Sequence, residues 1–158
     1  MITKEEVNTA QLNWGNAIVE IGKLKDKPVQ ELKDKTSAMI RELYHFEGGP
    51  IMFKPTRAKD NPFRGDFDAA LSYFIGHNEN FAEDDGFALQ PWTAVRFENF
   101  HVQLESKRAI AMGEYFFTTE DGEEKKVEYT FGYVKVPSGA LKIDLHHSSV
   151  PFAPTLGK

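Results

Sequence analysis

VEYTFGY, at residues 127–133, is a run in which every second residue carries a large apolar or aromatic side chain. Successive side chains of a β-strand point to opposite faces, so this period predicts a strand whose inner face packs into an aromatic core. Similar runs at 93–105, 108–118 and 140–149 predict three more strands, and Asp121-Gly122 is a typical hairpin signal between two of them. The second half of the chain therefore predicts an antiparallel meander of four strands.

The first half of the chain has a helical period. Thr3 and Glu6 have the spacing of a capping box, and the apolar residues that follow recur every three or four positions: Val7, Ala10, Trp14, Ala17, Ile18 and Ile21. A second helix is expected to start at Pro28 and to end at Gly48-Gly49, and a third to cover 66–75. Residues 51–53 predict a short strand between them.

This order of elements predicts a single α+β domain over residues 1–158. A strongly bent antiparallel sheet would pack against three helices from the N-terminal half and form a cone. In 93–105 the alternation shifts between Phe97 and Phe100, which predicts a β-bulge. The open end of such a cone is a natural pocket for a small molecule.

Composition excludes several classes of protein. The 158 residues include 19 Lys and Arg and 24 Asp and Glu, giving a net charge of −5, and no basic run would hold a nucleic acid. No stretch approaches the roughly 20 apolar residues of a membrane helix, and no signal-peptide core precedes the first helix, so a cytoplasmic location is expected. Without cysteine there is no disulfide or thiolate chemistry, and 13 Phe indicate an aromatic core or an aromatic-lined cavity.

The five histidines do not form a recognisable metal site. His146 and His147 are adjacent, and adjacent residues of a strand face opposite ways, so they cannot easily share one ion. No His-Glu-x-x-His motif occurs. We therefore expect neither a metal ion nor another cofactor.

Parity in the last strand decides which polar side chains face inward. Leu141, Ile143 and Leu145 share a face, and a regular strand would add His147 and Ser149 to it. His146 and Ser148 would then face solvent or a partner subunit. His147 as a satisfied core histidine and Ser149 as a strand-end cap remain alternatives. A Ser–His hydrolase is disfavoured because no Gly-x-Ser-x-Gly elbow is present.

Seven short motifs together resemble one family. They are FKPTRA (53–58), NPFR (61–64), SYF (72–74), EDDGFALQPWT (83–93), AMGEYFF (111–117), VEYTFGY (127–133) and HHSSVP (146–151). With these motifs the chain resembles the iota-class carbonic anhydrases, whose domains are similar to the association domain of calcium/calmodulin-dependent kinase II. The resemblance runs from the first helix to Phe152, and the HHSSVP ending is its most specific part.

The resemblance implies an NTF2-like cone, usually a homodimer, that reversibly hydrates carbon dioxide to bicarbonate, in the metal-free form of the class. By the family pattern, the substrate pocket would use Thr56, Tyr73 and Ser149, with His147 beside them. We expect the hydroxyls to position a water molecule and bicarbonate, and His147 to take the proton of that water. Thr56 and Tyr73, taken alone, are equally compatible with structural roles.

Two other functions remain open at the level of sequence. The same architecture serves as a non-catalytic association module, which a carbon dioxide hydration assay would separate from an enzyme. It also serves isomerases and dehydratases that act on larger apolar substrates. Such an enzyme would need a roomy cavity and a buried Asp or Glu as base.

Overall fold

The computed structural model describes residues 1–154, which fold in the predicted order of elements. Three helices are found in the first half: α1 (Lys4–Gly22), α2 (Val29–Leu43) and α3 (Phe67–Ile75). The five strands are β1 (Met52–Lys54), β2 (Ala94–Leu104), β3 (Arg108–Thr118), β4 (Glu124–Lys135) and β5 (Leu141–Ser149). Short 3₁₀ turns, η1 (Phe46–Gly48) and η2 (Phe87–Leu89), lie in the connections.

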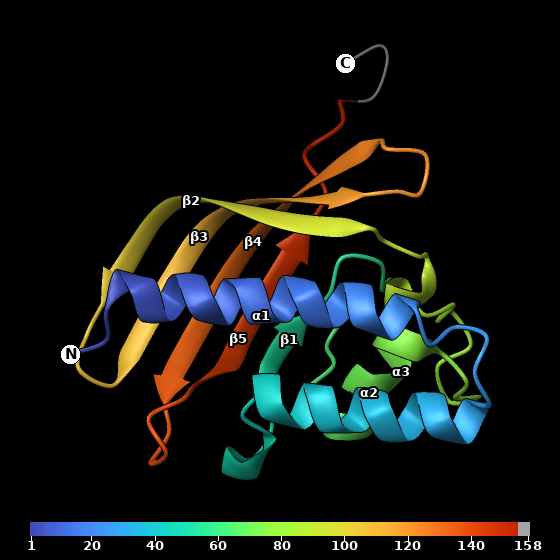
Figure 1. Cartoon of the computed structure of the whole chain (residues 1–158), viewed down its shortest axis with the longest axis horizontal. Helices are drawn as coiled ribbons and strands as arrows, with labels where there is room; N and C mark the ends of the chain where they lie inside the picture. Colours follow the sequence, from blue (N-terminus) through green and yellow to red (C-terminus); the bar gives the residue numbers. More distant parts are fainter. Residues whose placement is uncertain (155–158) are drawn as a thin grey trace.

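One five-stranded sheet has the order β1-β5-β4-β3-β2, with β1 parallel to β5 and the other pairs antiparallel. Figure 1 shows the sheet bending around α1, which crosses its concave face, while α2 runs beside α1. The core lies between α1 and this face, and Trp14, 2% exposed, is at its centre. This is the bent sheet with helices on one face that the sequence predicts. Among the described residues, no helix combines the length and apolar character needed to span a bilayer.

The prediction for the start of α1 and the prediction for the end of α2 have different outcomes. The capping box at the start of α1 is confirmed, because Thr3 Oγ1 accepts the N–H of Glu6 and Glu6 accepts the N–H of Thr3. The predicted end of α2 at Gly48-Gly49 is wrong. Tyr44 leaves the helix in an extended conformation and forms a β-bridge with Ile143. The bridge draws the Tyr44 side chain into the core, where it is fully buried.

The bulge predicted in β2 is confirmed. The register with β3 shifts between Asn99 and His101, which leaves Phe100 as the extra residue. Phe100 is 82% exposed on the outer face of the sheet. Gly113 lies opposite, where a Cβ atom would collide with the backbone of Glu98, so the bulge depends on glycine.

A second bulge, which alternation along the strand did not reveal, overturns the predicted parity of β5. Tyr133 pairs with Ile143 and Gly132 pairs with Leu145, so Asp144 is an extra residue. Because one residue is inserted, every later side chain changes face. His146 and Ser148 are therefore buried, at 2% and 1% exposure.

The predicted inward position of His147 and Ser149 is thus wrong: His147 is exposed and Ser149 is half-buried. One ion pair and one glycine hold the bulge in place. Arg108 Nη1 donates to Asp144 Oδ2 at 2.8 Å, and a Cβ atom at Gly132 would lie only 2.8 Å from Leu145 Cβ. The inserted residue is therefore fixed by an ion pair and by a close approach that glycine permits.

Candidate functional site

His146 is held between aromatic rings at the centre of the molecule. Its ring stacks on Phe131 with a centroid distance of 4.0 Å and on Phe53 with 4.8 Å. Tyr44 Oη lies 2.8 Å from its Nδ1, and Tyr115 Oη lies 3.0 Å from its Nε2. Burial, with a smaller contribution from His147, lowers the pKa of His146 well below its usual value, so its imidazole is neutral.

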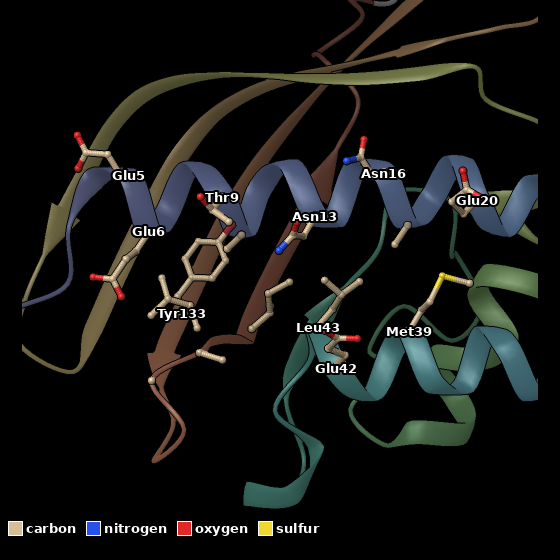
Figure 2. Close-up of a pocket in the computed structure, with 16 residues that line it drawn as sticks. Glu5, Glu6, Thr9, Asn13, Asn16, Glu20, Met39, Glu42, Leu43 and Tyr133 are labelled. Carbon is tan, nitrogen blue, oxygen red and sulfur yellow. The ribbon is translucent and has the colours of Figure 1, made fainter.

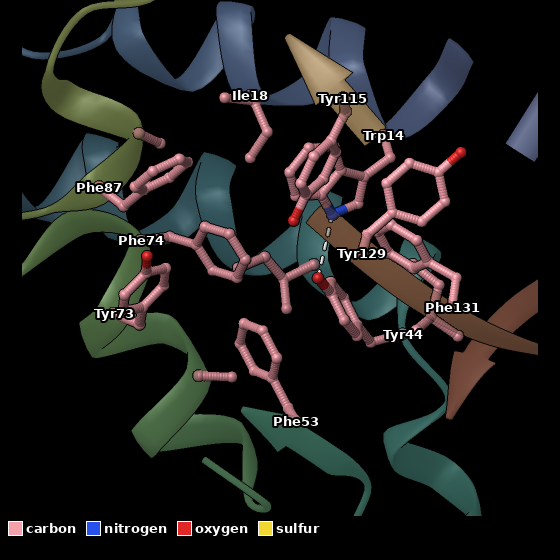
Figure 3. Packing of buried hydrophobic residues seen from close by; sticks show 14 of the residues in the cluster. Trp14, Ile18, Tyr44, Phe53, Tyr73, Phe74, Phe87, Tyr115, Tyr129 and Phe131 are labelled. Atoms are coloured by element: carbon pink, nitrogen blue, oxygen red, sulfur yellow. Dashed lines mark hydrogen bonds between the residues drawn. The ribbon is translucent and has the colours of Figure 1, made fainter. Parts of the chain in front are cut away.

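A chain of hydrogen bonds leads from His146 to the loop after β1. Tyr115 Oη lies 2.5 Å from Ser148 Oγ, and Ser148 Oγ lies 2.6 Å from Thr56 Oγ1. On the far side of the histidine, Trp14 Nε1 donates to Tyr44 Oη at 3.0 Å, as the dashed line in Figure 3 shows. Burial raises the pKa values of the Tyr44 and Tyr115 hydroxyls, which therefore keep their protons at neutral pH.

A small cavity lies at the end of this chain. Its lining combines aromatic walls with hydroxyl groups and the imidazole: Trp14, Phe53, Pro55, Thr56, Tyr73, Phe74, Phe87, Tyr115, His146 and Ser148. Its volume of about 10 Å³ is close to the smallest that holds one water molecule. Its lining contains no carboxylate. Figure 3 shows Tyr73, Phe74 and Phe87 on one side of the cluster and Tyr115 on the other.

Tyr73 completes the polar part of the cavity. It lies on α3, is 5% exposed, and its ring stacks on Phe87 with a centroid distance of 5.5 Å. Its Oη accepts the backbone N–H of Arg57 at 3.1 Å, which ties α3 to the loop that carries Thr56. Burial raises the pKa of Tyr73 to about 12, so this hydroxyl is a hydrogen-bond donor at neutral pH.

A buried ion pair fixes α3 and the loops around the cavity. Arg64 is fully buried and donates to both carboxylate oxygens of Asp84, at 2.7 and 2.8 Å. Ser72 Oγ, one residue before Tyr73, donates to Asp84 at 2.6 Å. Glu83 accepts the N–H groups of residues 59, 60 and 61. Arg64 therefore belongs to the frame of the site.

The four residues expected at the site separate into two pairs. Thr56 and Tyr73 line the cavity. His147 and Ser149 instead line a shallow depression on the outer face of the sheet, beside Phe100 and Met112. The bulge at Asp144 is the reason, and it replaces them in the cavity with their neighbours His146 and Ser148.

Sequence reasoning did not single out Trp14, Tyr44 or Tyr115 as parts of the site. Trp14 and Tyr115 fall on apolar faces, where an aromatic residue is ordinarily core. Tyr44 lies in a segment that was expected to be helical. A usable signal is the hydroxyl or N–H that each carries, because such groups find a partner when they are buried.

Further hollows lie outside the cavity. One of about 370 Å³ shares Tyr73 and Phe87 with it and has Lys25, Arg57 and Asp85 around it, and we call this adjoining hollow the vestibule. A groove of about 600 Å³ lies between α1 and α2, with Tyr133 on its floor and exposed carboxylates such as Glu5 and Glu42 at its rim (Figure 2). It shares no lining residue with the cavity. In residues 1–154 no three His, Cys, Asp or Glu side chains gather in a way that could hold a metal ion.

Solved structures of other proteins have the same architecture. An NTF2-like superfamily protein from Salmonella enterica matches at a TM-score of 0.55 with 10% identity, covering 98% of this chain and 95% of its own, which shows a shared fold. A crystal structure of a cyanobacterial iota-carbonic anhydrase complexed with bicarbonate matches at a TM-score of 0.92 and 35% identity, covering 97% of this chain and 94% of that one.

The sequence comparisons agree with the structural ones. A metal-independent carbonic anhydrase from Nostoc sp. is 37% identical over 153 residues, which are 96% of this chain and 75% of the relative. The family model described as metal-independent carbonic anhydrase matches residues 5–150. The chain therefore belongs to the metal-independent carbonic anhydrase family, on an NTF2-like fold.

Proposed function

We propose that this carbonic anhydrase hydrates carbon dioxide, without a metal ion, in the cavity lined by Thr56, Tyr73 and Ser148. The observation that carries the proposal is the pairing of aromatic walls with converging hydroxyls at one buried point. Carbon dioxide has no net dipole and suits the Phe-lined side. Bicarbonate is an anion and needs hydrogen-bond donors in the same place.

Tyr73 is the clearest donor to the anion. Its oxygen already accepts the N–H of Arg57, so its own hydrogen is available to a ligand. The solved cyanobacterial relative is complexed with bicarbonate, and its similarity over nearly the whole chain supports the same ligand here. The cavity of about 10 Å³ has room for about one water, so the lining must move apart when the anion binds.

In the reaction, a water oxygen attacks the carbon of carbon dioxide and one proton is released. Negative charge develops on the oxygens of the product, where the hydroxyls of Thr56 and Tyr73 would donate hydrogen bonds. Preorganised donors of this kind are worth about 10²- to 10³-fold each in turnover. The proton would leave through the vestibule beside Tyr73 to solvent or buffer. Zinc enzymes instead lower the pKa of bound water to about 7, so slower turnover is expected here.

The histidine has a different place from the one the sequence suggested. His147 lies on the outer face and cannot take a proton from the cavity. His146 lines the cavity, but Tyr44 and Tyr115 already occupy its two ring nitrogens. It therefore acts on the cavity through Tyr115 and Ser148.

Stopped-flow measurement of carbon dioxide hydration tests the proposal directly. The full chain is assayed before and after exhaustive dialysis against a chelator, and equal activity in the two samples is expected. Absence of activity in both samples would favour the association module. Loss on chelation with recovery on adding manganese or zinc would refute the metal-free reaction. The small cavity and its lack of a carboxylate disfavour an isomerase or dehydratase for larger substrates.

We also propose that the chain forms a homodimer through the outer face of the sheet. Phe100 and Met112 are 82% and 50% exposed on neighbouring strands, and the row continues through Thr130 to His147. Two copies of this row can bury Phe100 and Met112 against each other around a two-fold axis. Sedimentation of the wild type and of Phe100→Asp tests this, with a dimer and a monomer expected. A monomeric wild type would contradict the proposal. The cytoplasmic location stays a prediction, to be tested by cell fractionation.

A further inference from the structure

The hydrogen-bond chain through His146 begins at a group that can only donate. Trp14 Nε1–H donates to Tyr44 Oη at 3.0 Å, and the indole has no lone pair to accept in return (Figure 3). Tyr44 is fully buried and keeps its own proton. Among the described residues, the other side-chain partner of its hydroxyl is His146 Nδ1, at 2.8 Å. The Tyr44 hydrogen must therefore point to that nitrogen.

This assignment fixes the tautomer of His146. Nδ1 is an acceptor, and a neutral imidazole carries a single N–H, which then lies on Nε2. The neutral form follows from the position of the ring between Phe53 and Phe131, away from any carboxylate. Nε2–H donates to Tyr115 Oη at 3.0 Å.

The remaining bonds then have one direction. Tyr115 Oη accepts from His146, so its own hydrogen goes to Ser148 Oγ at 2.5 Å. Ser148 in turn donates to Thr56 Oγ1 at 2.6 Å. The hydrogen of Thr56 is then available on the cavity side, next to that of Tyr73.

We propose that Trp14 is a positioning residue that, through Tyr44, holds His146 as the Nε2–H tautomer and so directs the Thr56 hydroxyl hydrogen at the substrate. The reverse direction would need Nδ1–H. Tyr44 would then receive two hydrogens, and its own buried hydrogen would have no acceptor, which is costly. The single indole N–H thus decides between two otherwise equivalent networks.

The consequence for catalysis rests on the proposed function. His146 in this tautomer cannot receive a proton from the cavity through Ser148 and Tyr115, because every bond in that path points the other way. The imidazole of His146 instead polarises the hydroxyls of Tyr115, Ser148 and Thr56, which donate one to the next. Each hydroxyl that accepts a hydrogen bond becomes a stronger donor to the next group, so Thr56 presents a strengthened donor to the forming anion.

The tautomer is measured on the full chain with ¹⁵N-labelled histidine, by two-bond nitrogen–proton correlation NMR. In the wild type we expect His146 with Nε2 protonated and Nδ1 unprotonated. A wild type with Nδ1 protonated would overturn the proposal, whatever the hydration activity. The spectrum needs no substrate, so it separates this inference from the proposed reaction.

The role of Trp14 is tested by removing its N–H while keeping its shape. Site-specific incorporation of 3-benzothienylalanine at position 14 replaces that group with sulfur, and Trp14→Phe is a second variant. With the donor gone, Tyr44 can accept from Nδ1, so a detectable Nδ1–H population is expected. kcat should fall by between about 10- and 10²-fold as Thr56 loses its fixed orientation.

Trp92 offers the matched control. It is equally buried, and its Nε1–H donates to the backbone oxygen of Phe87 at 2.9 Å, outside the chain through His146. The same benzothienyl replacement at position 92 should leave the His146 tautomer unchanged. An unchanged tautomer with the replacement at position 14, or an equal change at both positions, would refute the role of Trp14.

Discussion

Thr56 Oγ1 and Ser148 Oγ lie 2.6 Å apart although 92 positions separate them in the chain. The parallel pairing of β1 with β5 brings them together, since Thr56 follows β1 and Ser148 lies near the end of β5. The two hydroxyls meet where the aromatic walls of the cavity converge. Their contact joins the loop that carries Thr56 to the hydrogen-bond chain through Tyr115 and His146.

Removing the Ser148 hydroxyl should lower kcat for carbon dioxide hydration by about 10- to 10²-fold, because Thr56 then loses the hydrogen bond that orients it and strengthens its donation to the anion. Ser148→Ala removes a single oxygen, so folding should persist. Ser149→Ala is the matched control, because it makes the same change one residue further on, outside the cavity. Stopped-flow assays of the two variants check this, and equal activities would place the reaction elsewhere.

Tyr73→Phe should have a comparable effect by a different route. The ring and its stacking on Phe87 remain, but the donor to the anion and the acceptor for the Arg57 N–H are lost. We expect kcat to fall by about 10²-fold or more and the thermal midpoint to drop slightly. Tyr133→Phe is the control, since that buried tyrosine lies outside the cavity. A Tyr73→Phe enzyme with full activity would exclude this hydroxyl from the reaction.

The buried His146 should make folding stability fall in acid. Its folded-state pKa lies well below 6.5, so below pH 6.5 the unfolded state binds a proton that the folded state does not. Stability from this group is complete above pH 6.5 and is lost as the pH falls towards the folded pKa. The slope is at most about 1.4 kcal/mol per pH unit.

Urea unfolding between pH 7 and pH 5 would measure this slope. His146→Gln cannot charge, so the difference between wild type and variant isolates the histidine from other groups. The difference should shrink as the pH is lowered. A constant difference across this range would show that His146 titrates alike in both states.

Breaking the Arg64–Asp84 pair should cost much of the folding stability. Both side chains are almost fully buried, at 0% and 1% exposure, so Arg64→Met leaves the Asp84 carboxylate without its counter-charge. A loss of about 3–5 kcal/mol in the free energy of unfolding is expected. Lys23→Met, which breaks an exposed pair with Glu20, should cost about 0–1 kcal/mol. Similar costs for the two variants would contradict the buried frame around the cavity.

Most of the fold follows from local patterns in the sequence. The capping box at Thr3, the period of residues 127–133 and the bulge near Phe100 all rest on neighbours within a few residues. The bulge at Asp144 is different. Ile143 and Leu145 are both apolar, so the alternation continues across the insertion, and the partner that holds it, Arg108, is 36 positions away.

The site likewise has residues that the sequence could predict and residues that depend on contacts between distant segments. Thr56 and Tyr73 could be placed from family motifs, whereas the choice between His146 and His147 needed the register of β5 with β4. Tyr44 was hidden because its bridge with Ile143 interrupts a segment with helical period. Arg64 was hidden because burial of a cation depends on a carboxylate, Asp84, that the sequence does not pair with it.

The bulge at Asp144 also decides what an altered strand would bring into the cavity. Because Asp144 is the extra residue, its deletion would leave Ile143 opposite Tyr133 and Leu145 opposite Gly132, and His146 and Ser148 would still point inward. Straightening the strand with Asp144 retained would instead place Leu145 opposite Phe131, where His146 now lies, and His147 opposite Tyr129, where Ser148 now lies. An apolar side chain would then replace the imidazole, so neither the second histidine nor the second serine can substitute for its neighbour.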